Sequence, residues 1–505
     1  MKILIINPPF YRLQRASLVH YPPSCCYIAA VLEKAGFNDI LIYNADFDPH
    51  KKTILGNTNH LNIKALTELA EEYDRRLHDD GDPIWEEIRQ FIRQYRPDLL
   101  FLSVFSTTLT AGNKIAKTAK ELDPAIKTVF EGCTNRGLHC AIDPSTNADV
   151  SVMDFALRKE PEVTAVELVQ ALASKSNDFS KIKGLSWKKN GGMVHNEDRP
   201  PLEDLDWLPF PARHLLYGAE KTPPHSFQGI YGSRGCPFDC VFCGCHTSWG
   251  YKPRLRSAKN MVDEMESVYR RFGTRYFYIC DDIFFIQKDR ALEFCDLLLR
   301  RRLPLFWSAQ TRAEMADDKT LSMMKKAGGQ HIAVGVEVGN PGIRELIKKG
   351  NTVDDVRRCA KLIRKHGLYM VAFCMVGLPW EGTKEIRDTV NLIKEIKPYI
   401  VYPYLATPAA GTELADFLAR KNPQGLAEYR DRCHISTASS LTEGIDAEEK
   451  KRVLDGAMEE FARINRKSLL LDALKRPRFY MALAHDMGFF QNPGFFLGYL
   501  REYLE

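Results

Sequence analysis

Long apolar runs are missing from this sequence of 505 residues. The apolar segment from Ile3 to Ile6 is shorter than the roughly 7–15 residues of a signal-peptide core. No stretch reaches the roughly 18 apolar residues that a membrane-spanning helix needs. These absences predict a cytoplasmic protein without a membrane span.

An excess of one charge is also missing. The 70 Lys and Arg residues nearly balance the 65 Asp and Glu residues, which leaves a formal net charge of +5, and no long basic run is present. Proteins that bind nucleic acids usually gather Lys and Arg on one face or along one helix. The sequence therefore indicates no nucleic-acid partner.

What the sequence does contain is the composition of a globular protein, with 45% hydrophobic and 27% charged residues. Its length predicts two or three domains. Because no secretion signal is present, its 13 cysteines are expected to stay reduced, and a tight cysteine cluster is then expected to bind metal or to act in catalysis.

Strand and helix patterns alternate through the first 173 residues. A helix follows Pro22-Pro23, with Ser24 as its predicted N-cap and Gly36 as its stop. This alternation predicts an α/β fold with a doubly wound, Rossmann-like parallel sheet over residues 1–173, whose ligands bind beyond the carboxyl ends of the strands. Its apolar strands are expected at residues 1–10, 40–43, 98–105 and 127–130.

The rest of the chain divides into three further segments. Residues 174–225 are interpreted as a linker with short strands and a hairpin tip at Asn190-Gly191-Gly192. Residues 226–420 are predicted to form a partial (β/α)6 barrel of the TIM type, with active residues at the carboxyl ends of its strands. Residues 421–505 are predicted to form a small helical C-terminal domain, which either caps the barrel or forms a wall of a substrate pocket. The six barrel strands are expected at residues 229–231, 276–279, 305–309, 332–336, 370–376 and 400–404.

Three cysteines, Cys236, Cys240 and Cys243, follow the first barrel strand within eight residues. Thiolates are the ligands of iron–sulfur clusters, and a 4Fe–4S cluster usually takes four of them. Three thiolates leave one iron open, which a catalytic site needs because a substrate or cofactor must bind there. The spacing therefore favours a catalytic 4Fe–4S cluster.

A zinc site is the alternative, with Cys245 and His246 as the remaining ligands. Zinc sites usually combine two pairs of ligands, and no convincing second pair is present. A non-catalytic zinc or iron–sulfur binding protein stays open as a reading of another functional class.

At these cysteines the chain resembles the radical S-adenosylmethionine (radical SAM) superfamily, whose motif has three cysteines separated by three and then two residues. The resemblance implies a 4Fe–4S cluster and S-adenosylmethionine as cofactors. It also implies that Glu337 and Arg312 bind the ribose or methionine part of S-adenosylmethionine and that Gly377 lies beside the adenine. The complete set of residues implied to bind this cofactor is Phe242, Asp282, Gln310, Arg312, Glu337 and Gly377.

The first strand with Asn7-Pro8-Pro9, the Pro22-Pro23 helix and the later Pro200-Pro201 and Pro209-Phe210-Pro211 segments make the chain similar to the cobalamin-dependent, class B radical SAM methyltransferases. This resemblance implies a cobalamin between the first domain and the barrel. No Asp-x-His-x-x-Gly run is present, so a histidine of that motif cannot be the lower cobalt ligand. The residues expected at the cobalamin are Asn7, Pro8, Ser103, Ser106, Thr107, Glu131, Gly132 and Cys133.

The resemblance implies a C-methyltransferase that methylates an unactivated carbon through a 5′-deoxyadenosyl radical and methylcobalamin, with an external electron donor of the flavodoxin or ferredoxin type. No catalytic base is predicted, because hydrogen abstraction by a radical needs none. A protein side chain, for example of methyl-coenzyme M reductase, is one expected substrate. The alternative is a radical SAM enzyme that methylates or rearranges a small natural product, a lipid or a pigment.

Overall fold

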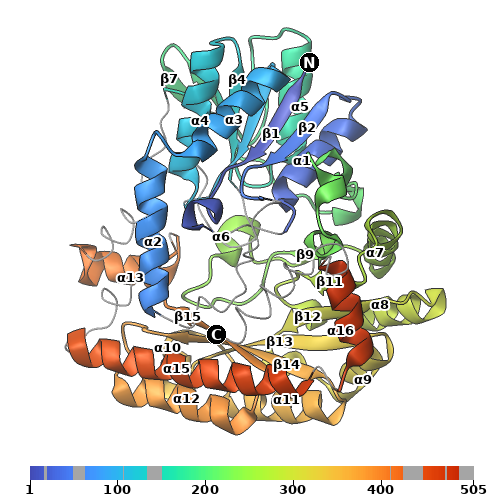
Figure 1. The fold of residues 1–505 in the computed structure, drawn as a ribbon, viewed down its shortest axis with the longest axis vertical. Coiled ribbons are helices and arrows are strands. Elements are labelled where there is room, and N and C mark those ends of the chain that lie inside the picture. The colour runs from blue at the N-terminus through green and yellow to red at the C-terminus, as the bar shows by residue number, and fades with distance from the viewer. Residues whose placement is uncertain are drawn as a thin grey trace.

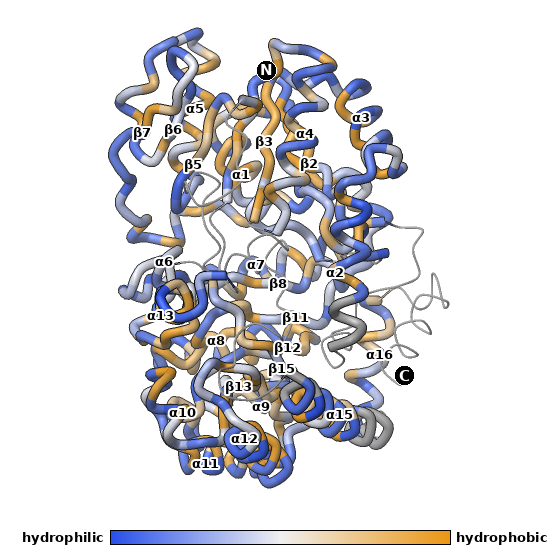
Figure 2. Tube along the Cα trace, turned by 90° about the vertical axis from the view of Figure 1, so that its left-hand side faces the viewer, coloured by the Kyte–Doolittle hydropathy of each residue, from blue (hydrophilic) through white to orange (hydrophobic). Residues whose placement is uncertain are grey.

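The computed structural model describes residues 1–15, 20–48, 63–105, 107–132, 151–409, 411–424, 447–472 and 475–487. Within these residues the chain forms two large sheets. Figure 1 shows the first sheet above the second, with the short helix α6 (Cys245–Trp249) between them. Figure 2 shows the same two layers after a quarter turn.

The first sheet has seven strands in the order β2-β1-β3-β4-β5-β6-β7. The first five in this order are parallel, and the strand order reverses between β1 and β3. In a doubly wound sheet the ligand site lies at such a reversal, outside the carboxyl ends of the strands. The strands are β1 (Ile3–Asn7), β2 (Ile40–Asn44), β3 (Leu99–Ser103), β4 (Lys127–Glu131), β5 (Phe155–Leu157), β6 (Leu185–Lys189) and β7 (Gly192–His195).

Helices cover both faces of this sheet. Ile3 and Ile5 share a core with α1 and α5, whereas Leu4 and Ile6 share a core with α2, α3 and α4. Strands that are buried on both faces have nearly continuous apolar sequences, as Figure 2 shows for β3. The prediction of a doubly wound sheet is confirmed. Its helices are α1 (Pro23–Lys34), α2 (Ile63–His78), α3 (Pro83–Tyr95), α4 (Leu109–Leu122) and α5 (Glu162–Ala173).

The predicted hairpin is confirmed between β6 and β7. Asn190 and Gly191 have φ values of 51° and 83°, which the two-residue turns of right-twisted hairpins require. Because β6 pairs with β5, this part of the predicted linker extends the first sheet. The domain boundaries drawn from the sequence stay a prediction.

One local prediction for the first domain is wrong. Ser24 does not cap α1, since the cap position is Pro22 and no side chain caps the helix there. The Ser24 hydroxyl instead donates to the Glu131 carboxylate at the end of β4, at 2.8 Å. Ser24 therefore bonds Glu131, far away in the sequence, and not a backbone amide of its own helix.

The second sheet contains six parallel strands in the order β15-β14-β13-β12-β11-β8. Its end strands β8 and β15 do not pair with each other, so the barrel is partial, as predicted. Six helices follow its strands: α7 (Ala258–Phe272), α8 (Lys288–Arg301), α9 (Asp318–Lys326), α10 (Pro341–Leu346), α11 (Val353–Lys365) and α12 (Thr383–Ile396). The strands are β8 (Gly229–Ile230), β11 (Tyr276–Ile279), β12 (Phe306–Thr311), β13 (Gly329–Glu337), β14 (Tyr369–Val376) and β15 (Ile400–Leu405).

Smaller elements connect these units. The Ser257 hydroxyl accepts a hydrogen bond from the Asn260 amide at 3.1 Å, which confirms the predicted cap of α7. A two-stranded pair, β9 (Ser233–Arg234) and β10 (Arg254–Leu255), flanks the cysteine segment. The 3-10 helices are η1 (Arg12–Gln14), η3 (Leu205–Trp207), η4 (Arg213–Leu215), η5 (Ala219–Lys221), η6 (Pro224–Phe227), η7 (Phe284–Ile286) and η8 (Ala313–Met315).

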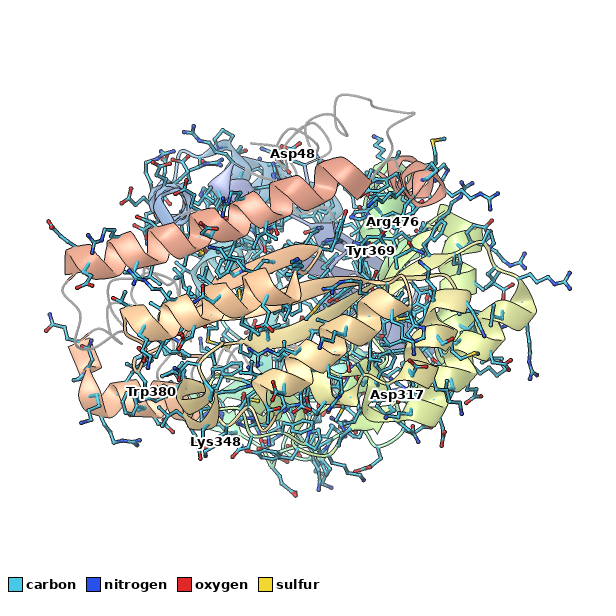
Figure 3. The ribbon with its side chains drawn as sticks, turned by 90° about the horizontal axis from the view of Figure 1, so that it is seen from below. Asp48, Asp317, Lys348, Tyr369, Trp380 and Arg476 are labelled. Carbon is cyan, nitrogen blue, oxygen red and sulfur yellow. The ribbon has the colours of Figure 1, made fainter. Side chains whose placement is uncertain are left out.

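The described C-terminal part is helical, as predicted, with α13 (Glu413–Lys421), α15 (Ala447–Asp472) and α16 (Pro477–Asp486). The Asn465 amide on α15 exchanges two hydrogen bonds with the Val401 backbone, at 2.7 and 2.9 Å, which ties α15 to β15. Arg476 lies over the Tyr369 ring, 3.7 Å from its centroid. Figure 3 labels both residues in a view from below. None of the helices in the described ranges combines the length and the apolar character that crossing a membrane requires.

Buried ion pairs join the two sheets. Arg213 donates to Glu264 of α7 at 2.6 Å and to the Gly229 carbonyl of β8 at 2.9 Å. The same Arg213 donates to the Tyr21 hydroxyl of the first domain at 2.8 Å. Because the side chains of Arg213 and Glu264 are 2% and 1% exposed, this network fixes the first domain against the edge of the barrel at β8.

Candidate active site

The three predicted cluster ligands lie in the segment between β9 and α6. Gly235 precedes them with a φ of 91°, and a Cβ there would overlap the Lys252 carbonyl oxygen, so only glycine fits. The Cys243 amide donates to the Cys240 carbonyl at 3.0 Å, and the Val241 amide donates to the Ile347 carbonyl at 3.2 Å. These bonds hold the segment in one conformation.

The first domain also holds this segment. Arg234, two residues before Cys236, pairs with Glu160 at 2.9 Å and with Glu162. Arg254 pairs with the same Glu160 at 2.5 Å. The cysteine segment is therefore anchored on both strands of the β9–β10 pair.

The thiols have different environments. Cys240 is buried, and burial raises the pKa of its thiol. The interaction with the Cys245 thiol lowers the pKa of Cys236, whereas burial raises the pKa of Cys243 to about 12. The charges of the Cys240 and Cys236 thiolates also raise the pKa of Cys243, so the three thiols lie near one another.

The donor set fits a 4Fe–4S cluster, because each of the three thiolates can bind a separate iron. In the ranges that the structure describes, no three side chains of His, Cys, Asp or Glu are grouped to hold one metal ion. A zinc ion needs its sulfur ligands at ~2.3 Å from one centre, whereas the thiolates of a 4Fe–4S cluster bind separate irons. Cys245, the proposed extra zinc ligand, donates to Asp282 at 2.9 Å.

Two cations lie beside Cys240. Arg312 follows β12 and places Nη1 3.7 Å from the Cys240 sulfur, while its guanidinium lies 3.7 Å from the centroid of the Phe238 ring. Lys349 also faces Cys240, and the positive charges of Arg312 and Lys349 both oppose the rise of the Cys240 pKa. These cations favour the thiolate form that binds iron.

Lys349 pairs with Glu337 at 2.7 Å, and their side chains are 7% and 13% exposed. Glu337 ends β13 with a φ of 58°, next to a shift in the register between β13 and β14. A non-glycine residue in this conformation is strained, and such strain gathers at functional sites. A Cβ on Gly335 would lie 2.5 Å from Glu337 and 2.7 Å from Lys349, so the glycine makes room for the pair.

Two more predicted residues follow neighbouring strands. Asp282 follows β11 and accepts the hydrogen bond from Cys245. Gln310 near the end of β12 accepts a hydrogen bond from the Tyr278 hydroxyl at 3.1 Å. Asp282 thus reaches the cysteine segment, while Gln310 lies in the interior of the barrel beside Tyr278.

Phe242 and Gly377 lie at an apolar part of the site. Phe242 packs against an apolar cluster that includes Met375 and Leu378, which lie on either side of Gly377 in the sequence. Gly377 has a φ of 85°, and a Cβ there would meet nothing within 4 Å. This open space next to an apolar cluster suits a flat ring such as adenine.

The structure therefore brings Cys240, Arg312 and Glu337 together, adds Asp282 beside Cys236 and Cys243, and pairs Phe242 with the Gly377 turn. The sequence reasoning missed Lys349. This residue lies 12 positions after Glu337, beyond α10, and no motif marks it. The one local signal is the Lys348-Lys349-Gly350 sequence, a basic pair before a glycine, which indicates a turn at this point of the chain.

The residues predicted at the first sheet lie at its carboxyl edge. The Asn7 amide donates to Asn44 at 2.8 Å, across the ends of β1 and β2. Glu131 ends β4 beside Ser103 of β3, in register, and is fully buried. Burial raises the pKa of Glu131 to about 7, against hydrogen bonds from Ser103 and Ser24.

The remaining predicted residues of this edge are less informative. Pro8 and Gly132 are buried directly after β1 and β4, and the Thr107 carbonyl accepts a hydrogen bond from Tyr73 at 2.5 Å. Ser106 and Cys133 lie outside the described residues. The Asn7, Asn44 and Ser103 side chains at the strand ends are neutral polar groups, which suit a ligand rich in amides, such as cobalamin. The charge of Arg12, after β1, is paired with Glu87 at 2.7 Å.

Comparison with known proteins decides the class of the barrel. The model of the Radical SAM superfamily matches residues 230–393. Residues 230–393 are a radical SAM domain. The predicted resemblance is confirmed, and the chain is an enzyme whose radical SAM domain uses a 4Fe–4S cluster and S-adenosylmethionine.

Relatives cover most of the chain. An uncharacterized methyltransferase of Pyrococcus horikoshii is 28% identical over 380 residues, which are 74% of this chain and 81% of the relative. An anaerobic magnesium-protoporphyrin IX monomethyl ester cyclase of Rubrivivax gelatinosus is 24% identical over 83% of this chain and 70% of its own length.

A solved structure shares both sheets of the fold. The radical SAM methyltransferase TsrM from Kitasatospora setae, with cobalamin and a 4Fe–4S cluster bound, superposes with a TM-score of 0.61. It is 17% identical, and the match covers 83% of this chain and 78% of TsrM. This likeness confirms the predicted combination of a Rossmann-like sheet with a radical SAM domain.

Proposed function

We propose that the chain is a cobalamin-dependent radical SAM methyltransferase that adds a methyl group to an unactivated carbon. The observation that carries this proposal is the presence of two ligand edges in one chain, whose two sheets the Arg213 network joins. The radical SAM domain supplies one, and the carboxyl edge of the first sheet, at the β1–β3 reversal, supplies the other. The names of the Pyrococcus relative and of TsrM support methyl transfer and cobalamin.

The cofactors, when bound, supply the 5′-deoxyadenosyl radical and the methyl group, and the chain's residues position them. Cys236, Cys240 and Cys243 hold the cluster. Lys349 and Glu337 offer a cation and an anion beside Cys240, which matches the carboxylate and ammonium groups of the methionine part of S-adenosylmethionine. Phe242 and the Gly377 turn hold the adenine.

One part of the barrel interior is apolar. The inner face of the barrel, turned away from the helices, contains an apolar cluster of Ala333, Val371 and Ile400 with Phe373 and Tyr402 packed against it. Apolar walls leave a reactive radical without a nearby hydrogen-bonded water. The substrate carbon is expected to enter this interior, between the two ligand edges.

For the methyl acceptor we propose a protein side chain, for example of methyl-coenzyme M reductase, on the resemblance to the class B family. The electron donor is a flavodoxin or ferredoxin. A small pigment or other natural product is the second candidate, favoured by the Rubrivivax relative, whose name assigns it to a tetrapyrrole.

The test is anaerobic reconstitution with iron, sulfide and cobalamin, followed by gel filtration and by incubation with methyl-deuterated S-adenosylmethionine. The proposal expects corrinoid to elute with the protein and labelled methyl groups to enter a candidate peptide. Label in a tetrapyrrole and not in the peptide would move the substrate to the second candidate. Loss of the corrinoid on gel filtration would contradict cobalamin dependence.

A further inference from the structure

The turn after β5 lies at the carboxyl edge of the first sheet. Leu157, at the end of β5, pairs in register with Glu131 at the end of β4. Glu160 follows in the turn, Glu162 begins α5, and both carboxylates are buried. Burial raises the pKa of Glu131, and the negative charge of Glu162 adds to this rise. Glu162 therefore lies near the residues expected at the cobalamin.

Two arginines that flank the cysteine segment, residues 236–243, reach these carboxylates. Arg234 on β9 pairs with Glu160 at 2.9 Å and with Glu162. Arg254 on β10 pairs with Glu160 at 2.5 Å. The four side chains are between 2% and 10% exposed, and removing one partner of a buried ion pair is strongly destabilising. The pairs therefore tie the turn after β5 to the β9–β10 pair.

Trp249 extends this tie to the far side of the cysteines. It ends α6, and its ring lies 4.7 Å from the Arg234 guanidinium. The Trp249 carbonyl accepts a hydrogen bond from Arg254 at 3.1 Å. The carbonyl of the next residue, Gly250, accepts a hydrogen bond from the Cys236 amide at 3.3 Å. The cysteine segment is thus held from both ends against the turn after β5.

The Arg213 network joins the same two sheets at another place. The side-chain hydrogen bonds described for Arg213 go to Tyr21, Gly229 and Glu264, which all lie outside the cysteine segment. The two sheets therefore stay joined without Arg234. What the Arg234 pairs add is local, because they set where the cysteine segment lies relative to the carboxyl edge of the first sheet.

We propose that Arg234 is a positioning residue that fixes the iron–sulfur cluster relative to the cobalamin at the carboxyl edge of the first sheet. This inference rests on the proposed function, because it needs a cobalamin at that edge. The radical comes from one cofactor and the methyl group from the other, so both must reach the same substrate carbon. A misplacement of about 1 Å costs on the order of 10²-fold in rate. A buried tie between the two sites prevents such a misplacement.

Microwave power saturation of the cob(II)alamin signal in electron paramagnetic resonance tests this position without turnover. A reduced cluster is a rapidly relaxing spin, which raises the power needed to half-saturate the signal of a nearby cob(II)alamin. This increase falls steeply with the distance between the two centres. The cob(II)alamin-loaded protein is measured with a reduced cluster and without a cluster, in the absence of S-adenosylmethionine. The proposal expects a higher half-saturation power when the cluster is present.

Variants assign the effect to Arg234. Arg234→Met is expected to retain iron and corrinoid but to lower the half-saturation power toward the value of the cluster-free protein. Arg234→Lys keeps a cation that can pair with one carboxylate, and it is expected to restore part of the increase. Arg158→Met is the matched control, because Arg158 follows β5 in the same turn but pairs with Asp198 at 2.9 Å, outside the cysteine segment. It should keep the wild-type value.

A second variant covers a loss of folding. Arg234→Met leaves the buried Glu162 without its cation, whereas Arg254 still pairs with Glu160. If this variant does not fold or lacks iron, Arg234→Met combined with Glu162→Gln takes its place. The double variant removes the tie without leaving an unpaired buried charge, and it is expected to show the same lower half-saturation power.

The outcomes separate the two proposals. A wild-type half-saturation power in the Arg234→Met variant, or equal losses in Arg234→Met and Arg158→Met, would overturn the positioning role. So would a wild-type cob(II)alamin signal that the cluster does not change, since the two centres would then lie far apart. These results leave cobalamin binding intact. Failure of the wild type to retain any corrinoid would instead contradict the proposed function and this inference with it.

Discussion

The two carboxyl edges that face the middle of the molecule differ in the groups that end their strands. The barrel edge gathers charge, with Arg312 and the Lys349–Glu337 pair beside the Cys240 thiol. At its strand ends the first sheet presents the Asn7–Asn44 amide pair and a Glu131 carboxyl whose pKa burial raises to about 7. The charge of Arg12, after β1, is paired with Glu87 at 2.7 Å. Both edges are made of parallel strands, so topology alone does not set this difference.

The difference follows what each edge is proposed to bind. S-adenosylmethionine carries an ammonium, a carboxylate and a sulfonium, and fixed charges compensate its groups in a partly buried site. A corrinoid ring is surrounded by amides, and neutral donors and acceptors match amides without burying an uncompensated charge. Each variant below changes a residue of one edge, and the binding properties of the other edge are expected to stay unchanged.

The largest effect is expected for Cys240→Ala, which removes one of only three ligands of the cluster. Formation of 5′-deoxyadenosine from S-adenosylmethionine and a reductant should fall to background, with loss of iron. Cys295→Ala is the control, because Cys295 is buried on α8 away from the cysteine segment, and it should keep nucleoside formation. Nucleoside formation at the wild-type rate in Cys240→Ala would refute the ligand assignment.

Lys349→Met tests the charged edge. It leaves the Glu337 carboxylate, 13% exposed, without its cation, which costs about 3 kcal/mol of the free energy of unfolding and raises the KM for S-adenosylmethionine. The adjacent Lys348, labelled in Figure 3, pairs with Glu413 at 2.6 Å, and these side chains are 49% and 51% exposed. Lys348→Met should therefore cost less than ~1 kcal/mol. Equal losses of unfolding free energy for the two variants, measured with urea, would contradict the difference between the buried and the exposed ion pair.

Glu131→Gln tests the neutral edge. The folded pKa of about 7 lies above the ordinary value of 4.5, so the folded protein holds a proton that the unfolded chain releases between these pH values. The wild type therefore loses stability as pH rises from about 4.5 to 7, whereas the amide that replaces the carboxyl in the variant does not titrate. At pH 8 the variant should be more stable than the wild type by about 3 kcal/mol. Parallel stability curves from pH 4 to 8 would contradict the buried neutral carboxyl.

The smallest effect is expected for Gly377→Ala. The φ of 85° strains an alanine by about 1 kcal/mol, although its Cβ meets nothing within 4 Å. Gly36→Ala, with a φ of 93° and equally open surroundings, should lower the stability by a similar amount. Only Gly377→Ala should raise the KM for S-adenosylmethionine. A raised KM in both variants would show that strain, not the adenine site, is responsible.

Much of the fold and of the barrel edge could be predicted from the sequence, because local patterns encode them. The spacing of Cys236, Cys240 and Cys243 and the position of Glu337 at a strand end are local features. The six barrel strands alternate with helices in the same way.

The rest depends on partners that are distant in the sequence. Ser24 was predicted as a helix cap, but its hydroxyl bonds Glu131, 107 residues later. α10 lies between Glu337 and Lys349 in the sequence and returns the chain to the end of β13. No sequence motif indicates that Lys349 then bonds Glu337. Arg213 bonds both Tyr21 and Glu264, which lie 192 positions before it and 51 positions after it, so this network could not be read from any one segment.

The central claim is that the polypeptide leaves one iron of the cluster open for S-adenosylmethionine. Mössbauer spectroscopy of the anaerobic protein, reconstituted with iron-57, measures this iron directly. The account predicts that adding S-adenosylmethionine changes the signal of one iron site and leaves the other sites unchanged. A spectrum that S-adenosylmethionine does not alter, from a protein with its full cluster, would contradict the claim.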